Sequence, residues 1–230
     1  MDFVVQGEGE QAILDIVEGR AQERVLRCRR LDNLDDLPMP AWDYFIHQPY
    51  NWGGDWFPGT PVFTMNTSRG CPFHCTFCSV GSIWGRKYNC FSAEHIVADT
   101  DYLMQHYGAR GIYFREDNFT INRERTEKFR HLLLDRGIKI AWACETRVDT
   151  LDRDLVDLMH RAGLVTLYYG VESGSQEVLN RLQKKITLDQ TRATFGWCRE
   201  FGVKTPPASL WGCLGKHPRI SSKPWPWLTI

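Results

Sequence analysis

Gly111-Ile112-Tyr113-Phe114 is a short apolar run, and a helical pattern over residues 123–136 follows it after a polar stretch. Gly137 ends that pattern, and Ile138-Lys139-Ile140-Ala141-Trp142 is a second apolar run. Apolar runs of this length, bounded by glycine and polar residues, are typical of buried strands. A strand, a helix and a strand in this order predict one parallel βαβ unit with a right-handed crossover.

The same alternation extends on both sides of this unit. Further strands are predicted at residues 62–66 and 165–169, with a fifth beginning at Val203-Lys204. Helices are predicted at residues 92–106, 152–161, 175–182 and 188–201. The pattern is that of an α/β fold with a parallel sheet, either a barrel or an open layer. In both arrangements functional groups gather at the carboxyl ends of the strands.

Composition restricts the kind of partner. The chain has 230 residues, 43% of them hydrophobic and 24% charged, as in an average globular domain. Lysine plus arginine equals aspartate plus glutamate at 28 each, so bulk charge indicates neither a nucleic-acid nor a membrane partner. No apolar run approaches the roughly 20 residues that span a bilayer, and the N-terminus lacks a signal-peptide pattern. We therefore expect a cytoplasmic location.

Three of the eight cysteines lie together in Thr67-Ser68-Arg69-Gly70-Cys71-Pro72-Phe73-His74-Cys75-Thr76-Phe77-Cys78, directly after the first strand. The other five are scattered and are expected to be small buried hydrophobes. A chain of this length without an export signal does not use clustered cysteines as disulfides, so the cluster indicates a metal. Structural zinc takes four ligands, so a zinc site would need His74 or a distant cysteine as the fourth.

The Cys-x3-Cys-x2-Cys spacing, with Phe77 directly before the third cysteine, resembles the radical S-adenosylmethionine superfamily. The resemblance implies a partial (β/α)6 TIM-like barrel over residues 61–210 and a 4Fe–4S cluster on Cys71, Cys75 and Cys78. Three thiolates leave one iron without a protein ligand. In the superfamily that iron binds S-adenosylmethionine, which an electron from the cluster cleaves to methionine and a 5′-deoxyadenosyl radical. The radical then abstracts hydrogen from a substrate.

The resemblance also implies residues that hold S-adenosylmethionine. Phe77 is implied to pack near the adenine. Glu116 and Asp117 follow the second strand in Phe114-Arg115-Glu116-Asp117-Asn118-Phe119, where the superfamily has an acidic motif that holds the amino group. The alternative is a solvated loop in which Asp117 or Asn118 caps the next helix.

Two more strand ends match the superfamily. Glu172 and Ser173 lie in Gly170-Val171-Glu172-Ser173-Gly174, where the ribose hydroxyls and the methionine end would be held. Arg147 follows the third strand and is a candidate partner of the S-adenosylmethionine carboxylate. A salt bridge from Arg147 to Asp149 or Glu172 is the alternative. No side chain is assigned a catalytic role in the reaction itself.

The N-terminal part is similar to a particular domain junction. Gly7-Glu8-Gly9-Glu10 before a helix, and later Leu37-Pro38-Met39-Pro40-Ala41-Trp42, resemble the join between a cobalamin-binding domain and the radical core. Such enzymes include methylases of unactivated carbon and the anaerobic ring cyclase of chlorophyll synthesis. We expect residues 1–30 to be the end of a cobalamin-binding domain and 31–60 a linker. No Asp-x-His-x-x-Gly motif for the axial histidine occurs. Either a full-length parent carries this motif upstream and binds cobalamin, or the protein does without cobalamin.

The tail over residues 211–230 departs from the superfamily. One codon choice for residues 211–223, read two bases later, encodes GLPGETPEDIEQ, which is the continuation that the superfamily shows after the fifth strand. We therefore expect this tail to be out of frame. A barrel without its last strands has open edges, so a fragment of this kind would fold poorly and lack activity.

The function expected from these observations is a radical enzyme that acts on a small molecule. The reaction would be hydrogen abstraction or cobalamin-assisted methyl transfer, with an electron donor such as flavodoxin or ferredoxin. One alternative is a zinc-stabilised binding module without catalysis. Another is a methylthiotransferase-like radical enzyme, although the second cluster domain and the RNA-binding domain of that class are not visible in the sequence and the neutral charge does not favour RNA.

Overall fold

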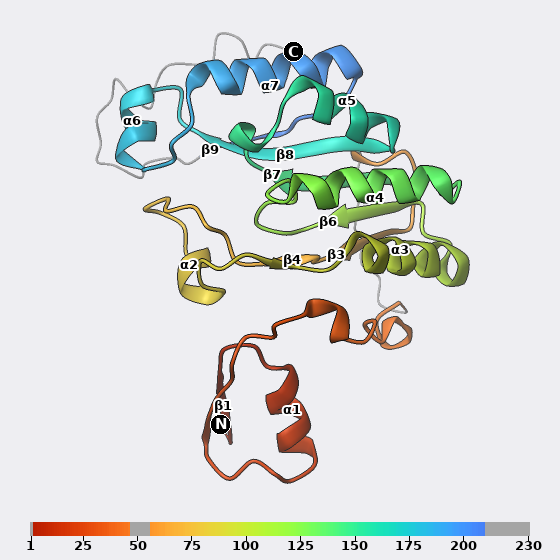
Figure 1. The fold of residues 1–230 in the computed structure, drawn as a ribbon, viewed down its shortest axis with the longest axis vertical. Helices are drawn as coiled ribbons and strands as arrows, with labels where there is room; N and C mark the ends of the chain where they lie inside the picture. The colour runs from red at the N-terminus through yellow and green to blue at the C-terminus, as the bar shows by residue number, and fades with distance from the viewer. Residues whose placement is uncertain (1, 47–55, 210–230) are drawn as a thin grey trace.

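The computed structural model describes residues 2–46 and 56–209. Its centre is a five-stranded sheet in the order β3-β6-β7-β8-β9, in which every neighbouring pair is parallel (Figure 1). The strands are β3 (Val62–Met65), β6 (Gly111–Phe114), β7 (Ala141–Thr146), β8 (Leu164–Glu172) and β9 (Pro207–Ser209). Parallel strands in sequence order, connected by helices, are those of an α/β fold, so the predicted α/β class is confirmed. The expectation for residues 211–230 lies outside the described residues.

Five helices follow the strands and lie within one residue of their predicted bounds. They are α3 (Ala93–Tyr107), α4 (Arg123–Asp135), α5 (Arg153–Arg161), α6 (Gln176–Arg181) and α7 (Leu188–Phe201). The Ser92 hydroxyl accepts from the His95 N–H at the start of α3, and Gly108 ends that helix at φ 64°. Thr187 and Gln190 form a reciprocal capping box at the start of α7. No described helix is long and apolar enough to cross a membrane.

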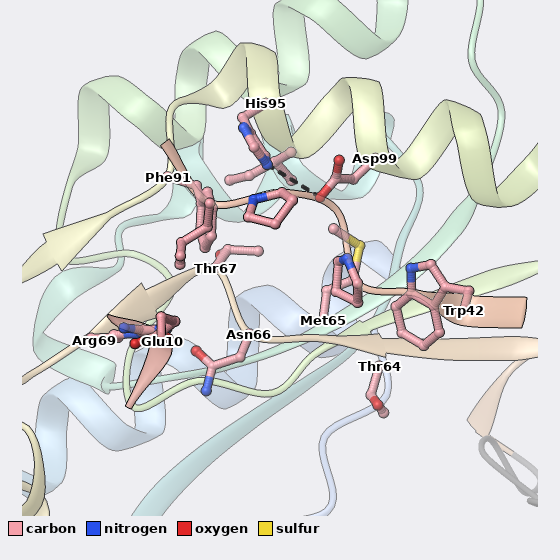
Figure 2. Close-up of a pocket in the computed structure, with 14 residues that line it drawn as sticks. Glu10, Trp42, Thr64, Met65, Asn66, Thr67, Arg69, Phe91, His95 and Asp99 are labelled. Carbon is pink, nitrogen blue, oxygen red and sulfur yellow. Dashed lines mark hydrogen bonds and ion pairs between the residues drawn. The ribbon is translucent and has the colours of Figure 1, made fainter. Parts of the chain in front are cut away.

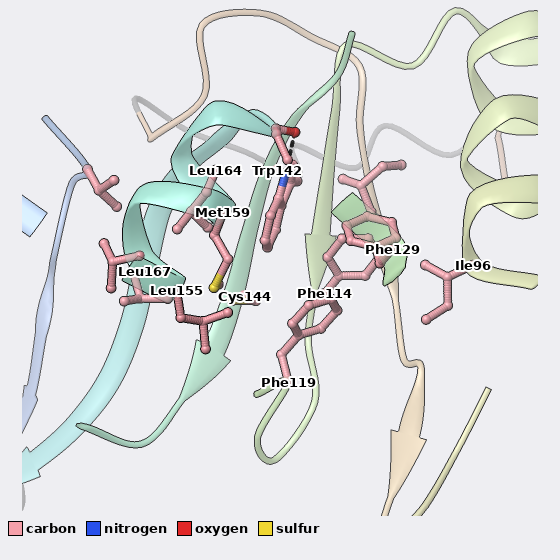
Figure 3. Packing of buried hydrophobic residues seen from close by; sticks show 14 of the residues in the cluster. Ile96, Phe114, Phe119, Phe129, Trp142, Cys144, Leu155, Met159, Leu164 and Leu167 are labelled. Atoms are coloured by element: carbon pink, nitrogen blue, oxygen red, sulfur yellow. Dashed lines mark hydrogen bonds between the residues drawn. The ribbon is translucent and has the colours of Figure 1, made fainter. Parts of the chain in front are cut away.

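The core lies between the sheet and the helices (Figure 3). Phe114, Phe119, Phe129 and Trp142 are fully buried, and their ring centroids are 5.0–5.8 Å apart. The Trp142 indole N–H donates to the Ala162 carbonyl oxygen at 2.8 Å, so burial of this ring leaves no donor unpaired. Each such ring contributes about 2–3 kcal/mol by burial alone, which makes the aromatic cluster the centre of stability.

The opposite face of the sheet carries polar side chains. Tyr113, Glu145 and Tyr168 alternate along their strands with residues that face the helices, and all three are half-buried. The Tyr113 hydroxyl donates to Glu145 Oε1 at 2.7 Å, and the two tyrosine rings are 5.1 Å apart. This face and the carboxyl ends of the strands are therefore where the fold can hold ligands.

Three strands differ from their predicted bounds by more than one residue. β7 begins at Ala141 because residues 138–140 close α4, and the Ile138 N–H donates to the Leu133 carbonyl. β8 continues to Glu172, so the Gly-Val-Glu segment is the end of a strand and not a loop after it. The fifth strand does not begin at residue 203. Lys204 makes only an isolated bridge, and β9 starts at Pro207, since Pro206 directly before it lacks an N–H donor for the ladder.

Residues 4–27 form a small separate unit (Figure 1). It consists of β1 (Val4–Gln6), α1 (Glu10–Val17) and β2 (Val25–Arg27), and the two strands pair in parallel. The sequence predicts one strand and one helix here, and the structure adds β2. The Glu8 carboxylate connects the unit to the segment that follows β3 by accepting from the Arg69 guanidinium at 2.8 Å. In the described residues 28–46 of the connector that follows, the regular structure consists of two short 3-10 turns, Leu34–Asp36 and Trp42–Tyr44.

Candidate functional site

A two-stranded ribbon closes the cysteine-bearing loop at its base. β4 (Ser68–Arg69) continues from β3 and pairs in an antiparallel manner with β5 (Asn89–Cys90). Gly70 opens the loop at φ 87°, and a Cβ there would lie 2.3 Å from the Lys87 carbonyl oxygen, so only glycine fits. The loop therefore sits at the carboxyl end of the first strand of the sheet, as predicted.

The three clustered cysteines differ in exposure. Cys71 and Cys75 are half-buried, and Cys78 is exposed. The Cys78 N–H donates to the Cys75 carbonyl at 3.2 Å, which turns the chain back on itself. Burial raises the pKa of the Cys71 thiol, and the negative charges of Asp117 and Cys78 act in the same direction, against the cation of Arg147. These groups therefore lie within electrostatic range of one another.

The donor set of the loop fits an iron–sulfur cluster. Within residues 2–46 and 56–209, no three His, Cys, Asp or Glu side chains are gathered tightly enough to form a finished metal site. The thiols nevertheless come from one short loop, and thiolates are the ligands that such clusters take. His74, the nearby candidate for a fourth zinc ligand, is exposed. A cluster with three protein ligands would form when the loop draws its sulfurs together.

Arg147 lies against the cysteine loop. Its Nη1 is 3.3 Å from Cys75 Sγ, and its guanidinium is 3.8 Å from the centre of the Phe73 ring. Asp149 accepts two further bonds, at 2.9 and 2.8 Å, and the Lys184 carbonyl accepts another at 2.6 Å. The salt bridge to Asp149, which the sequence left open as an alternative, is therefore present. Arg147 joins the end of β7 to the loop.

The two acidic residues after β6 occupy different environments. Glu116 is buried, and both carboxylate oxygens accept hydrogen bonds, one from the Thr67 hydroxyl and one from the Ser68 hydroxyl. The guanidinium of buried Arg125 lies 3.6 Å from the same carboxylate. Glu116 thus supports the base of the cysteine loop.

Asp117 is half-buried, and its carboxylate has no hydrogen-bond partner among the described residues. Burial raises the pKa of this carboxyl, and the neighbouring charges of Glu116 and Glu145 raise it further. A cationic ligand group would relieve that cost. Of the two acidic residues, Asp117 is the one available for such a group.

The last residues of β8 meet an unpredicted lysine. Glu172 is buried at φ 60°, and its Oε1 accepts from Lys184 Nζ at 2.6 Å. The Ser173 hydroxyl accepts from the Ser175 N–H at 3.1 Å, which shapes the turn into α6. Lys184 Nζ also lies 5.6 Å from the centre of the Phe77 ring. The fold therefore brings Phe77, Arg147 and Glu172 together around Lys184.

Sequence reasoning missed Lys184, and no local signal marks it. The adjacent lysines of Leu182-Gln183-Lys184-Lys185-Ile186 look equivalent, but Lys184 is 6% exposed whereas Lys185 is exposed to solvent. Only the tertiary contacts separate the two.

A cavity of about 350 Å³ lies elsewhere, between the connector, the end of β3 and the start of α3 (Figure 2). Apolar side chains such as Trp42 and Met65 line it, and His95 Nε2 lies 3.5 Å from the Asp99 carboxylate at its rim. None of its lining residues is a predicted cluster or S-adenosylmethionine ligand. The predicted site is therefore formed by the loop and the strand ends and not by this cavity.

Comparison with protein families assigns the chain to a superfamily. The family model of the Radical SAM superfamily matches residues 65–212, which include the loop, the strand ends and Lys184. The chain therefore belongs to the radical S-adenosylmethionine superfamily, as the cysteine spacing predicts.

Curated relatives include two methyltransferases. Cytidylyl-2-hydroxyethylphosphonate methyltransferase of Streptomyces wedmorensis is 30% identical over 175 residues, which cover 74% of this chain and 33% of the relative. An uncharacterized methyltransferase of Pyrococcus horikoshii is 29% identical over 221 residues, which cover 88% of this chain and 47% of the relative. The chain thus spans less than half the length of these relatives.

Solved structures confirm the fold. The cobalamin-dependent S-adenosylmethionine radical enzyme OxsB, with aqua-cobalamin bound, superposes with a TM-score of 0.69 at 19% identity. The match covers 89% of this chain and 32% of that chain. This structural match covers more of the chain than the family model does, and it includes backbone from the part that precedes residue 65.

Proposed function

We propose that this chain is the S-adenosylmethionine-cleaving core of a radical enzyme that acts on a small molecule. Cys71, Cys75 and Cys78 would hold a 4Fe–4S cluster. When bound, the cluster supplies the electron that cleaves S-adenosylmethionine to a 5′-deoxyadenosyl radical, for hydrogen abstraction or cobalamin-assisted methyl transfer. The observation that carries the proposal is the position of the three thiols, on a ribbon-closed loop at the carboxyl end of β3 with Arg147 against Cys75.

The side chains around the loop would bind S-adenosylmethionine. Asp117 would accept hydrogen bonds from the amino group, because its carboxylate has no partner among the described residues and its pKa is raised by burial. Glu172 and Ser173 at the end of β8 would hold the ribose hydroxyls and the methionine end, and Phe77 would pack against the adenine. Glu116 would act indirectly, by fixing the start of the loop through Thr67 and Ser68.

The N-terminal unit supports the domain proposal. A two-stranded parallel ribbon is not stable alone, because parallel strands need further strands and cover on both faces. This unit exposes apolar side chains on its strands and on α1, namely Val4, Val5, Ile13, Leu14, Val17 and Val25. We infer that residues 1–30 are the edge of an α/β domain that binds cobalamin, that 31–60 link it to the core, and that 61–210 form the core.

A group of cations beside the loop supports an electron-donor proposal. Arg29, Arg86 and Lys87 are exposed, and none has a carboxylate partner in the described part of the chain. The Arg86 guanidinium donates to the Phe73 carbonyl inside the loop, and Arg30, the residue after Arg29, donates to the Lys87 carbonyl. These contacts place the group beside the predicted cluster. We propose that an acidic one-electron carrier such as flavodoxin or ferredoxin docks there in the cytoplasm.

Anaerobic reconstitution with iron and sulfide tests the function. The expected result is about four irons and four sulfides per chain, with 5′-deoxyadenosine or S-adenosylhomocysteine formed after reduction. Cys75→Ala should lose the cluster absorbance, whereas Cys198→Ala, which removes a buried cysteine of α7, should keep it. Full retention of iron in Cys75→Ala would refute the assignment, and zinc without iron would favour a zinc-stabilised module.

A further inference from the structure

We propose that Lys184 is a positioning residue of this site, which holds Glu172, Phe77 and the backbone beside Arg147 in one arrangement. The contacts of Lys184 follow from the fold alone. Their effect on a cluster and on S-adenosylmethionine binding rests on the proposed function. It adds a residue from the turn after α6, outside the cysteine loop and the predicted strand ends.

The ammonium group of Lys184 is buried and paired. Its Nζ donates to Glu172 Oε1 at 2.6 Å, and the two side chains are only 7% and 9% exposed. A buried carboxylate without a counter-charge is strongly disfavoured, so loss of this lysine would leave Glu172 buried and without its partner. The pairing uses one carboxylate oxygen and leaves the other for a ligand hydroxyl.

The turn that carries Lys184 is bonded to both sides of the site. The Lys184 carbonyl accepts from Arg147 Nη2 at 2.6 Å, and Arg147 in turn contacts Cys75. The Leu182 carbonyl accepts from the Thr76 N–H at 3.0 Å, between the second and third cysteines. The position of this turn therefore sets the position of the loop.

The backbone around the ion pair is strained. Among the described residues, the non-glycine positions with positive φ are Glu172 at 60°, Gln183 at 51° and Lys185 at 57°. The first is a member of the pair, and the other two flank Lys184. Such conformations are unfavourable for residues with a side chain and persist where the surroundings enforce them. A Cβ on Gly170 would lie 2.0 Å from Glu172 Oε1 and 2.8 Å from Lys184 Nζ. The pair is thus packed directly on the strand backbone.

The cation has two consequences for the site. Its distance of 5.6 Å from the Phe77 ring centre is that of a cation–π contact, which fixes the ring directly before the third cysteine. A positive charge at this place also stabilises the more negative, reduced state of a nearby cluster, and so raises its reduction potential.

Lys184→Met and Lys185→Met form a matched pair for the first test. Both replace a lysine by an apolar side chain of similar length, but only Lys184 makes the contacts above. In the cluster-free chain we expect hydrogen exchange at the Thr76 amide to quicken roughly tenfold in Lys184→Met and to stay unchanged in Lys185→Met. Equal exchange in the two variants would overturn the positioning role.

The second test uses the reconstituted protein. Lys184→Met should lower the reduction potential of the cluster and weaken S-adenosylmethionine binding roughly tenfold, and Lys184→Arg, which keeps the charge, should restore most of both. If Lys184→Met does not fold, Glu172→Gln removes the same ion pair and should show the same faster exchange at Thr76. An unchanged Thr76 amide in that variant would equally refute the proposal.

The two proposals fail in different ways. A wild-type chain that takes up no iron would refute the proposed function, and the exchange comparison would still decide the role of Lys184. Conversely, a loaded cluster whose potential is the same in Lys184→Met and Lys185→Met would reject the positioning role and leave the radical chemistry intact.

Discussion

The guanidinium of Arg147 lies 3.3 Å from the sulfur of Cys75, with Asp149 bound to its other side at 2.8 and 2.9 Å. A permanent charge is thus held against one predicted cluster ligand by a carboxylate two residues away. These contacts already use most of the N–H donors of Arg147. The arrangement therefore favours a role for Arg147 in stabilising the charge of the cluster over a role in binding the carboxylate of S-adenosylmethionine.

Arg147→Met should make the cluster harder to reduce. A unit charge a few ångströms from the cluster contributes on the order of 2 kcal/mol at an effective dielectric constant of about 20, which is on the order of 100 mV for one electron. A spectroscopic redox titration measures the shift. Arg136→Met, at the end of α4, serves as the control. An unchanged potential in Arg147→Met would contradict this reading of the contact.

Substitutions of Glu116 and Asp117 should have different effects, the first on the stability of the fold and the second on the binding of S-adenosylmethionine. Glu116→Gln should lower the free energy of unfolding by about 2–3 kcal/mol, because buried Arg125 then lacks its counter-charge. Asp117→Asn should fold normally but bind S-adenosylmethionine roughly 10- to 100-fold more weakly. Urea denaturation and calorimetric titration give the two quantities. The assignment is wrong if Asp117→Asn binds like the wild type while Glu116→Gln remains stable.

Asp99 should make stability depend on pH. Burial raises the pKa of this carboxyl and nearby Asp35 raises it further, although His95 opposes them. The folded state therefore binds a proton at Asp99 more readily than the unfolded chain does. Near neutral pH the ionised carboxylate lowers the free energy of unfolding. This destabilisation disappears as the pH falls through the pKa of the folded state. Asp99→Asn should melt at a higher temperature than the wild type at pH 7, with a smaller difference at pH 4. A constant difference would exclude this origin.

The double variant Arg29→Glu and Lys87→Glu should impair electron delivery only. Turnover driven by flavodoxin or ferredoxin should fall roughly tenfold at low salt, since steering by the exposed cations is lost. Turnover driven by dithionite, which needs no docking surface, should be unchanged. Lys139→Glu, at the connection between α4 and β7, should affect neither. Equal losses with both reductants would instead indicate damage to the site.

Much of the fold could be predicted from local pattern. The helices α3, α4, α5 and α7 lie within one residue of expectation, because their caps at Ser92, Asn122, Asp152 and Thr187 are sequence features that act on the nearest backbone donors. Strand ends were less accurate. β9 starts after Pro206 and β8 extends to Glu172, since pairing with a neighbouring strand, and not the run of apolar residues, sets where a strand ends.

The three cysteines could be identified as a ligand set from their spacing alone, since one short loop confines their sulfurs whatever the rest of the chain does. The roles of the surrounding charges could not, because they depend on contacts between residues far apart in sequence. Glu116 turns to the hydroxyls of Thr67 and Ser68, and Lys184 reaches Glu172 while its neighbour faces solvent. Burial and pairing distinguish chemically identical side chains, and both arise only when the sheet brings its strand ends together.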